Sequence, residues 1–426
     1  MKLTNKTRMK KILPYIACFF MLFLQACNNE VDDLFDTPAQ QRVNEELKAC
    51  KELLISSENG WVMEYYPSAN QSYGGYVMIL KFTDKDVTVQ SEIAANPSDA
   101  VTSLYSLKSD MGPTLNFDTY NKYLHYFADP DNNGGAGLGK GYEGDYEFII
   151  QSHTENEITL KGKKTKNIIK MKRMETSGDA YLTEIIKTRT NITSIQGILG
   201  YKGEVNGQEV SITIPSDRRM TIQVGTEQIF NVAYMYGLSG IQFYQPIEIG
   251  GNEISGLEWS ETNNSFMWNE NTLEQIPDPI YPKYLKYLGN YNMNYFYGQT
   301  ERNIPVTLIA KTFNGSEKSY ELQGLPFPLQ VSYNVEQDCL EILTYQKDGY
   351  YVAVWEVIGN GTLSWAGGLG LIGKLKEGTS NVYEFVDNGV WGTNIARALI
   401  LWSASGEYKG FGGDTRFQYI ILTKNQ

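Results

Sequence analysis

Histidine and cysteine, which build many catalytic and metal sites, are scarce in this chain. Its 426 residues include two histidines, His125 and His153, and four cysteines. There is no paired-cysteine metal signature, and two histidines are too few for a zinc site built from histidine. The sequence also has no Gly-x-Ser-x-Gly elbow and no His-Glu-x-x-His motif. We therefore predict no catalytic residue, and we expect a protein that is not an enzyme.

Basic residues are fewer than acidic residues. The whole chain has 37 Lys and Arg against 49 Asp and Glu, and residues 1–26 hold five basic residues and no acidic one. Without that segment, 32 basic and 49 acidic residues leave a formal net charge of −17. Such a surface repels phosphate backbones, so the balance argues against nucleic acid as a partner.

The N-terminus has the parts of a bacterial export signal. Basic residues precede an apolar run at 12–24, which is too short to cross a bilayer because a spanning helix needs ~20 residues. The run ends in LQAC at residues 24–27, which resembles the lipobox of a bacterial lipoprotein. We expect residues 1–26 to be a signal peptide and Cys27 to carry the lipid.

An acidic run, NNEVDDLFD, follows Cys27. It resembles the export signal that sends Bacteroidetes lipoproteins to the outer face of the outer membrane. The same composition also suits a solvated, disordered tether. The sequence thus predicts residues 27–36 as a lipidated acidic tether, on a protein that is anchored in the outer membrane and faces the cell exterior.

Periodicity indicates a mostly β fold, with α+β character at the N-terminus. One amphipathic helix is expected before Asn59-Gly60, because apolar residues recur at helical spacing at Ala39, Val43, Leu47, Cys50 and Leu54. From Trp61 the apolar period shifts to two, and Asn-Gly pairs mark tight turns. We expect antiparallel β-sandwich or barrel-like domains in tandem with one N-terminal helix.

The chain divides into several expected regions. Residues 37–175 are predicted as an N-terminal helix plus β domain, and residues 176–268 as a second β segment. Residues 269–283, with three prolines and no period, are typical of a linker. Residues 284–426 are predicted as a C-terminal β domain. Whether the second and third β segments are separate domains stays open.

The glycine-rich stretch at residues 129–140 matches part of a phosphate-binding loop. That loop needs Ser or Thr after its lysine and must open a helix, so that its amides face phosphate. Here Gly141 follows Lys140, and the expected strand DYEFII comes next. Nucleotide binding is therefore not indicated.

The same stretch matches the first half of a calcium loop. Asp129, Asp131 and Asn133 supply oxygens at positions one, three and five, although position twelve is Lys140 instead of Glu. These three residues are a candidate calcium site, and calcium is the one cofactor we consider. The alternative is a flexible connection in which Asp, Asn and Gly serve turn geometry.

Two further sets of residues have both a functional and a structural interpretation. Glu143, Asp145 and Glu147 alternate and are expected on one strand face, where two carboxylates could act as in a glycoside hydrolase. Alternating acids also occur on solvent-facing strands. Aromatic residues could stack on sugars or fill a β core, and the sequence does not say which are exposed: Tyr291, Tyr295, Tyr297, Trp355, Trp365, Trp391 and Trp402.

Two cysteines remain once Cys18 leaves with the signal and Cys27 takes lipid. Cys50 and Cys339 lie nearly 300 residues apart. Two buried free thiols are the favoured interpretation, because a disulfide framework would need more cysteines. A single disulfide between them stays open.

Several motifs resemble those of a known family. NGWVMEYYP, GGYVMILKF, YSLKSDMGPTLNFDTYNKYLHYF, GYEGDYEF and ITLKGKKT occur in this order. They resemble Bacteroidetes surface lipoproteins grouped as domain of unknown function family 4302. The resemblance implies an accessory surface lipoprotein, encoded near outer-membrane uptake receptors of the starch-utilisation type. It supplies no established catalytic residue.

These observations favour a non-catalytic role in nutrient uptake. The protein would bind a polysaccharide or peptide ligand, or dock on an outer-membrane uptake receptor complex. One alternative is a surface hydrolase of the glycoside hydrolase type, whose carboxylates are dispersed in the sequence. Another is a purely structural surface component.

The lipoprotein prediction can be tested at Cys27. We expect Cys27→Ala to abolish palmitate labelling and membrane attachment, because acyl chains on this residue would be the anchor. Metabolic labelling and membrane fractionation measure both. A Cys27→Ala protein that remained in the membrane fraction would show that the lipoprotein prediction is wrong.

Overall fold

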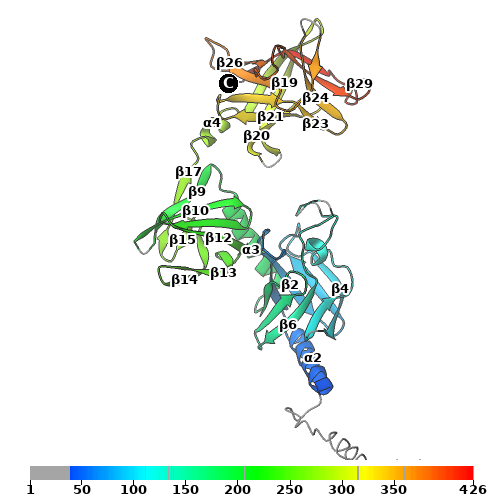
Figure 1. Ribbon diagram of the computed structural model, residues 1–426, viewed down its shortest axis with the longest axis vertical. Helices are drawn as coiled ribbons and strands as arrows, with labels where there is room; N and C mark the ends of the chain where they lie inside the picture. Colours follow the sequence, from blue (N-terminus) through cyan, green and yellow to red (C-terminus); the bar gives the residue numbers. More distant parts are fainter. Residues whose placement is uncertain are drawn as a thin grey trace, which may run out of the picture. The chain divides into compact units, whose positions relative to one another are not determined.

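The computed structural model describes residues 39–425, except 111, 133, 136, 138, 206, 314, 315 and 358–360 (Figure 1). The expected signal peptide, the acidic tether and Cys27 therefore lie outside the described residues. The chain forms two compact units. Of the described residues, unit 1 comprises those within 39–192, 214–262 and 266–270, and unit 2 comprises those within 193–213, 263–265 and 271–425.

Unit 1 begins with the expected N-terminal helix, α2 (Ala39–Ile55), at one end of a closed antiparallel barrel (Figure 1). Cys50 and Leu54 of α2 are buried in the barrel core, and the carbonyl of Leu54 accepts a hydrogen bond from the indole of Trp61 (2.9 Å). The pairing of β1 with β8 closes the barrel. Its strands are β1 (Trp61–Tyr65), β2 (Tyr76–Phe82), β3 (Asp86–Ser91), β4 (Ala100–Ser109), β5 (Pro113–Phe117), β6 (Glu147–His153), β7 (Glu157–Gly162) and β8 (Ile168–Arg173), with the 3-10 turn η1 (His125–Phe127) between β5 and β6.

Apolar side chains at every second position of the strands fill this barrel. Successive side chains of a strand point to opposite faces, so every second residue enters the core. Val87 and Val89 of β3 and Ile158 and Leu160 of β7 are buried, and their neighbours are partly exposed. The expectation of barrel-like antiparallel domains is confirmed.

The second β segment of unit 1 opens with a helix that the sequence analysis did not predict, α3 (Gly178–Thr193). Its buried stripe includes Leu182, Ile185 and Ile192. The Thr- and Ile-rich sequence has low helix propensity because β-branched side chains lose rotamer freedom in a helix, so packing decides the conformation. Further strands of unit 1 are β11 (Arg219–Val224), β12 (Gln228–Tyr236), β13 (Gly240–Ile249) and β14 (Asn252–Ser260), followed by β15 (Ser265–Trp268).

In unit 2, β9 (Ile198–Val205) pairs with both β10 (Gln208–Ser216) and β17 (Glu274–Pro277). Residues 269–283, predicted as a linker, thus contain β16 (Asn271–Thr272), β17 and the start of α4 (Tyr281–Leu285). Proline is compatible with β17 because β17 lies at the edge of its sheet and the register shifts between Ile276 and Pro277.

The C-terminal part of unit 2 is a large antiparallel sheet in which β18 also pairs with β30, so the strands from β18 round to β30 close on one another, and β28, β24 and β23 extend the sheet beyond β30. One continuous aromatic and aliphatic core fills it. Its strands are β18 (Gly289–Tyr297), β19 (Thr300–Phe313), β20 (Ser316–Gln323), β21 (Leu329–Asn334), β22 (Cys339–Leu343), β23 (Tyr345–Lys347), β24 (Tyr350–Trp355), β25 (Leu363–Ser364), β26 (Gly370–Leu375), β27 (Val382–Asp387), β28 (Ala398–Ser403), β29 (Gly406–Glu407) and β30 (Arg416–Lys424).

None of the helices in the described ranges is long and apolar enough to cross a membrane.

A buried ion pair joins the barrel of unit 1 to the strands that follow α3. The Arg218 guanidinium donates to both carboxylate oxygens of Glu92, at 3.0 and 3.1 Å, and both side chains are almost fully buried. The ring of Tyr76 in β2 lies 4.0 Å from the guanidinium carbon of Arg218. Arg189 of α3 donates to the carbonyl of Glu92 (3.0 Å). Burial alone would lower the pKa of Arg218, but the charge and hydrogen bonds of Glu92, together with Tyr76 and Asp217, outweigh it and raise the pKa.

We expect Glu92→Gln to destabilise unit 1 by about 3–5 kcal/mol, because it removes the buried counter-charge of Arg218 and leaves only the exposed carboxylate of Asp217, 3.4 Å away. Urea unfolding followed by tryptophan fluorescence measures the loss. The matched control is Glu261→Gln, which breaks the exposed pair of Lys187 and Glu261 (3.0 Å) and should change the free energy of unfolding very little, because solvent screens exposed charges. Equal effects of the two substitutions would contradict the central role given to Glu92.

Candidate functional site

The candidate calcium residues lie in a loop whose polar groups bond one another. The carboxylate of Asp129 accepts a hydrogen bond from the backbone N–H of Asp131 (2.9 Å). The side chain of Asn132 bonds Tyr126 and the N–H of Gly134. Asn133 lies outside the described residues. These are turn contacts, which fit the connection interpretation, and the calcium site stays a prediction.

The three alternating acids do not share a strand face, so that expectation is wrong. Glu143 precedes β6 with a positive φ of 58° and accepts a hydrogen bond from Ser68 (3.2 Å). Asp145 is buried, where its carboxylate accepts the N–H groups of Lys164 (2.5 Å) and Thr165 (3.0 Å). Only Glu147 belongs to β6, and it pairs with Lys163 (3.1 Å). Each acid thus holds a different part of the loop structure.

Cys50 and Cys339 are both buried and free. The interpretation as two free thiols is confirmed, and a disulfide between them is excluded. Burial raises the pKa of both thiols, to about 12 for Cys50. Neither thiol is therefore a nucleophile by itself at neutral pH, since the thiolate is the reactive form.

Two tyrosines of β18 belong to the core. Tyr291, Met293 and Tyr295 are buried, whereas Asn292 and Phe296 lie on the other face. Trp391 also packs against this core. For these residues the core interpretation is confirmed.

A second set of rings lies on the outer face of β24, β25 and β28. Alternate residues of β24 enter the core, namely Tyr350, Val352 and Val354. Tyr351 and Trp355 are consequently on the outer face and only partly buried. The ladder pairs Tyr351 with Trp402 of β28, so these two side chains stand next to each other.

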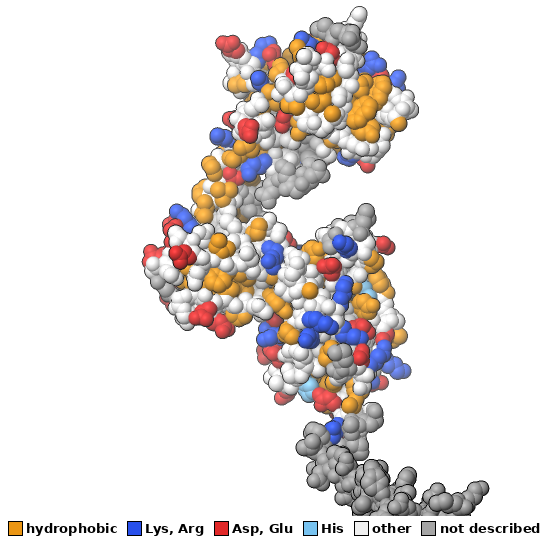
Figure 2. All heavy atoms as spheres, in the orientation of Figure 1, with side chains coloured by type: hydrophobic (Ala, Val, Ile, Leu, Met, Phe, Trp, Pro, Cys, Tyr) orange, Lys and Arg blue, Asp and Glu red, His pale blue; other side chains and the backbone are white. Residues whose placement is uncertain are grey.

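Trp365 completes this surface. Its ring stacks on Tyr351, with centroids 5.1 Å apart and planes inclined by 29°. Trp365 is 46% exposed although it is one of the largest apolar side chains. We call Tyr351, Trp355, Trp365 and Trp402 the aromatic face. Figure 2 shows hydrophobic side chains gathered over the part of unit 2 that carries β24 and β29.

Local contacts hold the rings in place. The carbonyl of Ala366, next to Trp365, accepts a hydrogen bond from Thr344 (2.6 Å). The indole of Trp355 donates to the carbonyl of Gly361 (3.1 Å). The ring of Trp355 is thus held by its own hydrogen bond, and the backbone next to Trp365 is anchored to Thr344.

A partly exposed ion pair borders the aromatic face. The guanidinium of Arg416 lies 5.6 Å from the centre of the Trp355 ring and is hydrogen-bonded to Glu407, which pairs with Trp402 across β28 and β29. Burial would raise the pKa of Glu407, but hydrogen bonds from Arg416 and Thr415 outweigh it and lower the pKa. Glu407 is therefore ionised at neutral pH and bonded to Arg416 and Thr415. The aromatic face itself consists of rings and has no carboxylate or basic side chain among its four residues.

Sequence reasoning named Trp355, Trp365 and Trp402 but could not group them. The alternation of YYVAVW places Tyr351 and Trp355 on one face of a strand. The pairing of β24 with β28 joins segments more than 40 residues apart, and nothing local in either segment specifies it.

Comparisons with known proteins give families without an assigned role. A family model described as a domain of unknown function (DUF4302) matches residues 31–261. A second model, also described as a domain of unknown function, matches residues 261–402, which include the aromatic face. No curated protein and no solved structure matches the chain. Since the first model covers more than half of the sequence, and the motifs quoted above fall within it, the chain belongs to the DUF4302 family.

Proposed function

We propose that this protein is a non-catalytic surface lipoprotein of the outer membrane, anchored through Cys27, which binds a polysaccharide nutrient on its aromatic face. The observation that carries the proposal is the exposed stack of Trp365 on Tyr351 beside Trp402. Export to the cell surface rests on the lipobox-like LQAC and the acidic run behind it. The proposed role is accessory to an uptake receptor complex.

The chemistry of the aromatic face favours a sugar ring as its ligand. One side of a pyranose is lined by C–H groups, which pack on the electron-rich face of an aromatic ring. Apolar surface that is exposed and held rigid in a monomer commonly marks a binding site. Because the chain without residues 1–26 carries a net charge of −17, a neutral polysaccharide fits better than an anionic one.

The binding test uses native gels that contain neutral or anionic polysaccharides. We expect retardation of the protein by a neutral polysaccharide, and about tenfold weaker binding for Trp365→Ala and for Trp402→Ala, since the lost contact is worth ~1–1.4 kcal/mol. The matched control is Tyr120→Ala in unit 1, which removes a ring that is 66% exposed. Equal retardation of all four proteins would show that the aromatic face is not the site.

The same samples separate the alternatives. Released reducing sugar would favour the hydrolase. Retardation lost on addition of chelator would favour the calcium site at Asp129, Asp131 and Asn133. Absence of retardation with every polysaccharide would exclude a glycan ligand among those tested and favour a peptide or a receptor protein.

A further inference from the structure

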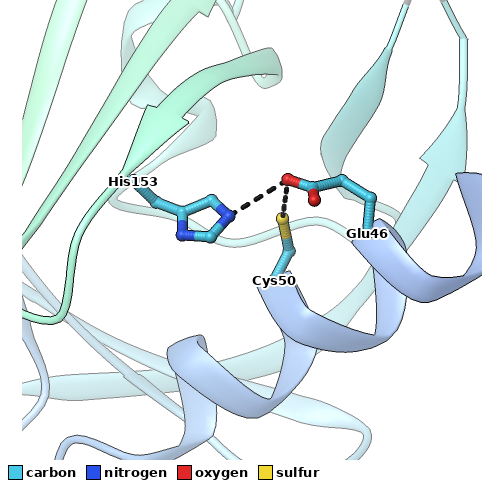
Figure 3. A group of neighbouring side chains, drawn as sticks. All are labelled: Glu46, Cys50 and His153. Atoms are coloured by element: carbon cyan, nitrogen blue, oxygen red, sulfur yellow. Dashed lines mark hydrogen bonds and ion pairs between the residues drawn. The ribbon is translucent and has the colours of Figure 1, made fainter. Parts of the chain in front are cut away.

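Three side chains with metal-binding atoms meet where α2 contacts the barrel (Figure 3). Nε2 of His153 lies 3.0 Å from Oε1 of Glu46, and Sγ of Cys50 lies 3.8 Å from the same oxygen. All three ligand atoms lie within 4.8 Å of one another. Among the described residues, this is the only such group of three His, Cys, Asp or Glu side chains.

Two regular structural features place these ligands together. Glu46 and Cys50 are four residues apart on α2, so their side chains lie on one face of the helix. In β6 the register against β7 shifts between Ile150 and Ser152, and His153 then pairs with the buried Ile158. A bulge of this kind turns the following side chain to the other face of the strand. His153 is thus directed toward the barrel interior and α2.

The spacing of the ligand atoms suits a tetrahedral zinc ion. Zinc binds sulfur at about 2.3 Å and nitrogen or carboxylate oxygen at about 2.0–2.2 Å, which puts ligand atoms about 3.4–3.6 Å apart at a tetrahedral angle. The observed 3.0 and 3.8 Å bracket that range. The third separation, between Sγ of Cys50 and Nε2 of His153, is at most 4.8 Å, so rotation of these side chains would bring all three atoms within bonding distance of one ion.

The charges of the three ligands and their exposure to solvent also suit a zinc ion. A thiolate and a carboxylate together neutralise a divalent cation, and the imidazole binds as the neutral ring. Cys50 is 2% exposed, whereas the side chains of His153 and Glu46 are 28% and 49% exposed. An ion can therefore enter from the Glu46 side and keep water as its fourth ligand.

From this geometry we propose that Glu46, Cys50 and His153 form a zinc site that fastens α2 to β6. Binding forms bonds from the ion to Sγ of Cys50, Nε2 of His153 and a carboxylate oxygen of Glu46. The Cys50 thiol proton passes to solvent, as does any proton shared by Glu46 and His153, and no oxidation is involved. The proposal is independent of the aromatic face, which belongs to unit 2.

The test uses the detergent-solubilised full chain with Cys18→Ala and Cys27→Ala, so that Cys50 and Cys339 are the remaining cysteines. We expect one zinc ion per chain and a higher thermal midpoint with zinc, because an ion that binds only the folded state stabilises it. Cobalt is the spectroscopic probe. A tetrahedral site with one thiolate gives a near-ultraviolet thiolate-to-cobalt band together with visible d–d bands.

Matched variants assign the ligands. Cys50→Ser should abolish the thiolate-to-cobalt band, and His153→Gln and Glu46→Gln should weaken zinc binding more than about 100-fold, beyond the loss typical of residues that only support a ligand. Cys339→Ser and His125→Gln replace the other buried thiol and the other histidine, and should change neither readout.

Two results would overturn the proposal. One is a chain that gives no thiolate-to-cobalt band. The other is His153→Gln binding zinc as tightly as the parent chain. His153→Gln decides the matter even where Cys50→Ser fails to fold, because His153 is partly exposed and does not belong to the apolar core.

Discussion

Alternation of side chains across antiparallel strands is the constraint on which both candidate sites depend. In β24, the burial of Tyr350, Val352 and Val354 determines that Tyr351 and Trp355 face outward. In β6, the bulge between Ile150 and Ser152 interrupts the alternation, and His153 turns toward α2 as a result. Tyr351 and Trp355 share the aromatic face because β24 keeps the alternation, and His153 meets Glu46 and Cys50 because β6 interrupts it once.

The ion pair of Glu92 and Arg218 fixes how the barrel of unit 1 aligns with the strands that follow α3. Apolar packing tolerates many arrangements of two surfaces, whereas a bidentate ion pair with buried donors requires one alignment. Tyr76 covers one side of the guanidinium, and Arg189 of α3 bonds the backbone of Glu92. A buried charge is costly unless all its partners are present, so this pair selects the alignment more than it adds stability.

The sequence predicted the fold class, α2 and the family well, because these depend on local periodicity and on contiguous motifs. It did not predict α3, whose β-branched residues have weak helix propensity and depend on burial of Leu182, Ile185 and Ile192. It also missed the grouping of Glu46, Cys50 and His153, since His153 lies 107 residues from Glu46. The scarcity of histidine argues against a zinc site built from histidine alone. It does not argue against a site that combines one histidine with a cysteine and a glutamate.

Composition alone would have misled about the aromatic residues. Thirty tyrosines suggest a surface rich in binding platforms, yet many are buried with their hydroxyl groups bonded to backbone. Examples are Tyr65 with Asp145, Tyr291 with Tyr287, and Tyr320 with Tyr284. Tyrosine serves these cores because it fills volume and still satisfies a carbonyl. Trp365 has no such core role: it stacks on one neighbour and leaves almost half of its surface in water. Its position, and not the abundance of aromatic residues, is therefore the argument for a ligand.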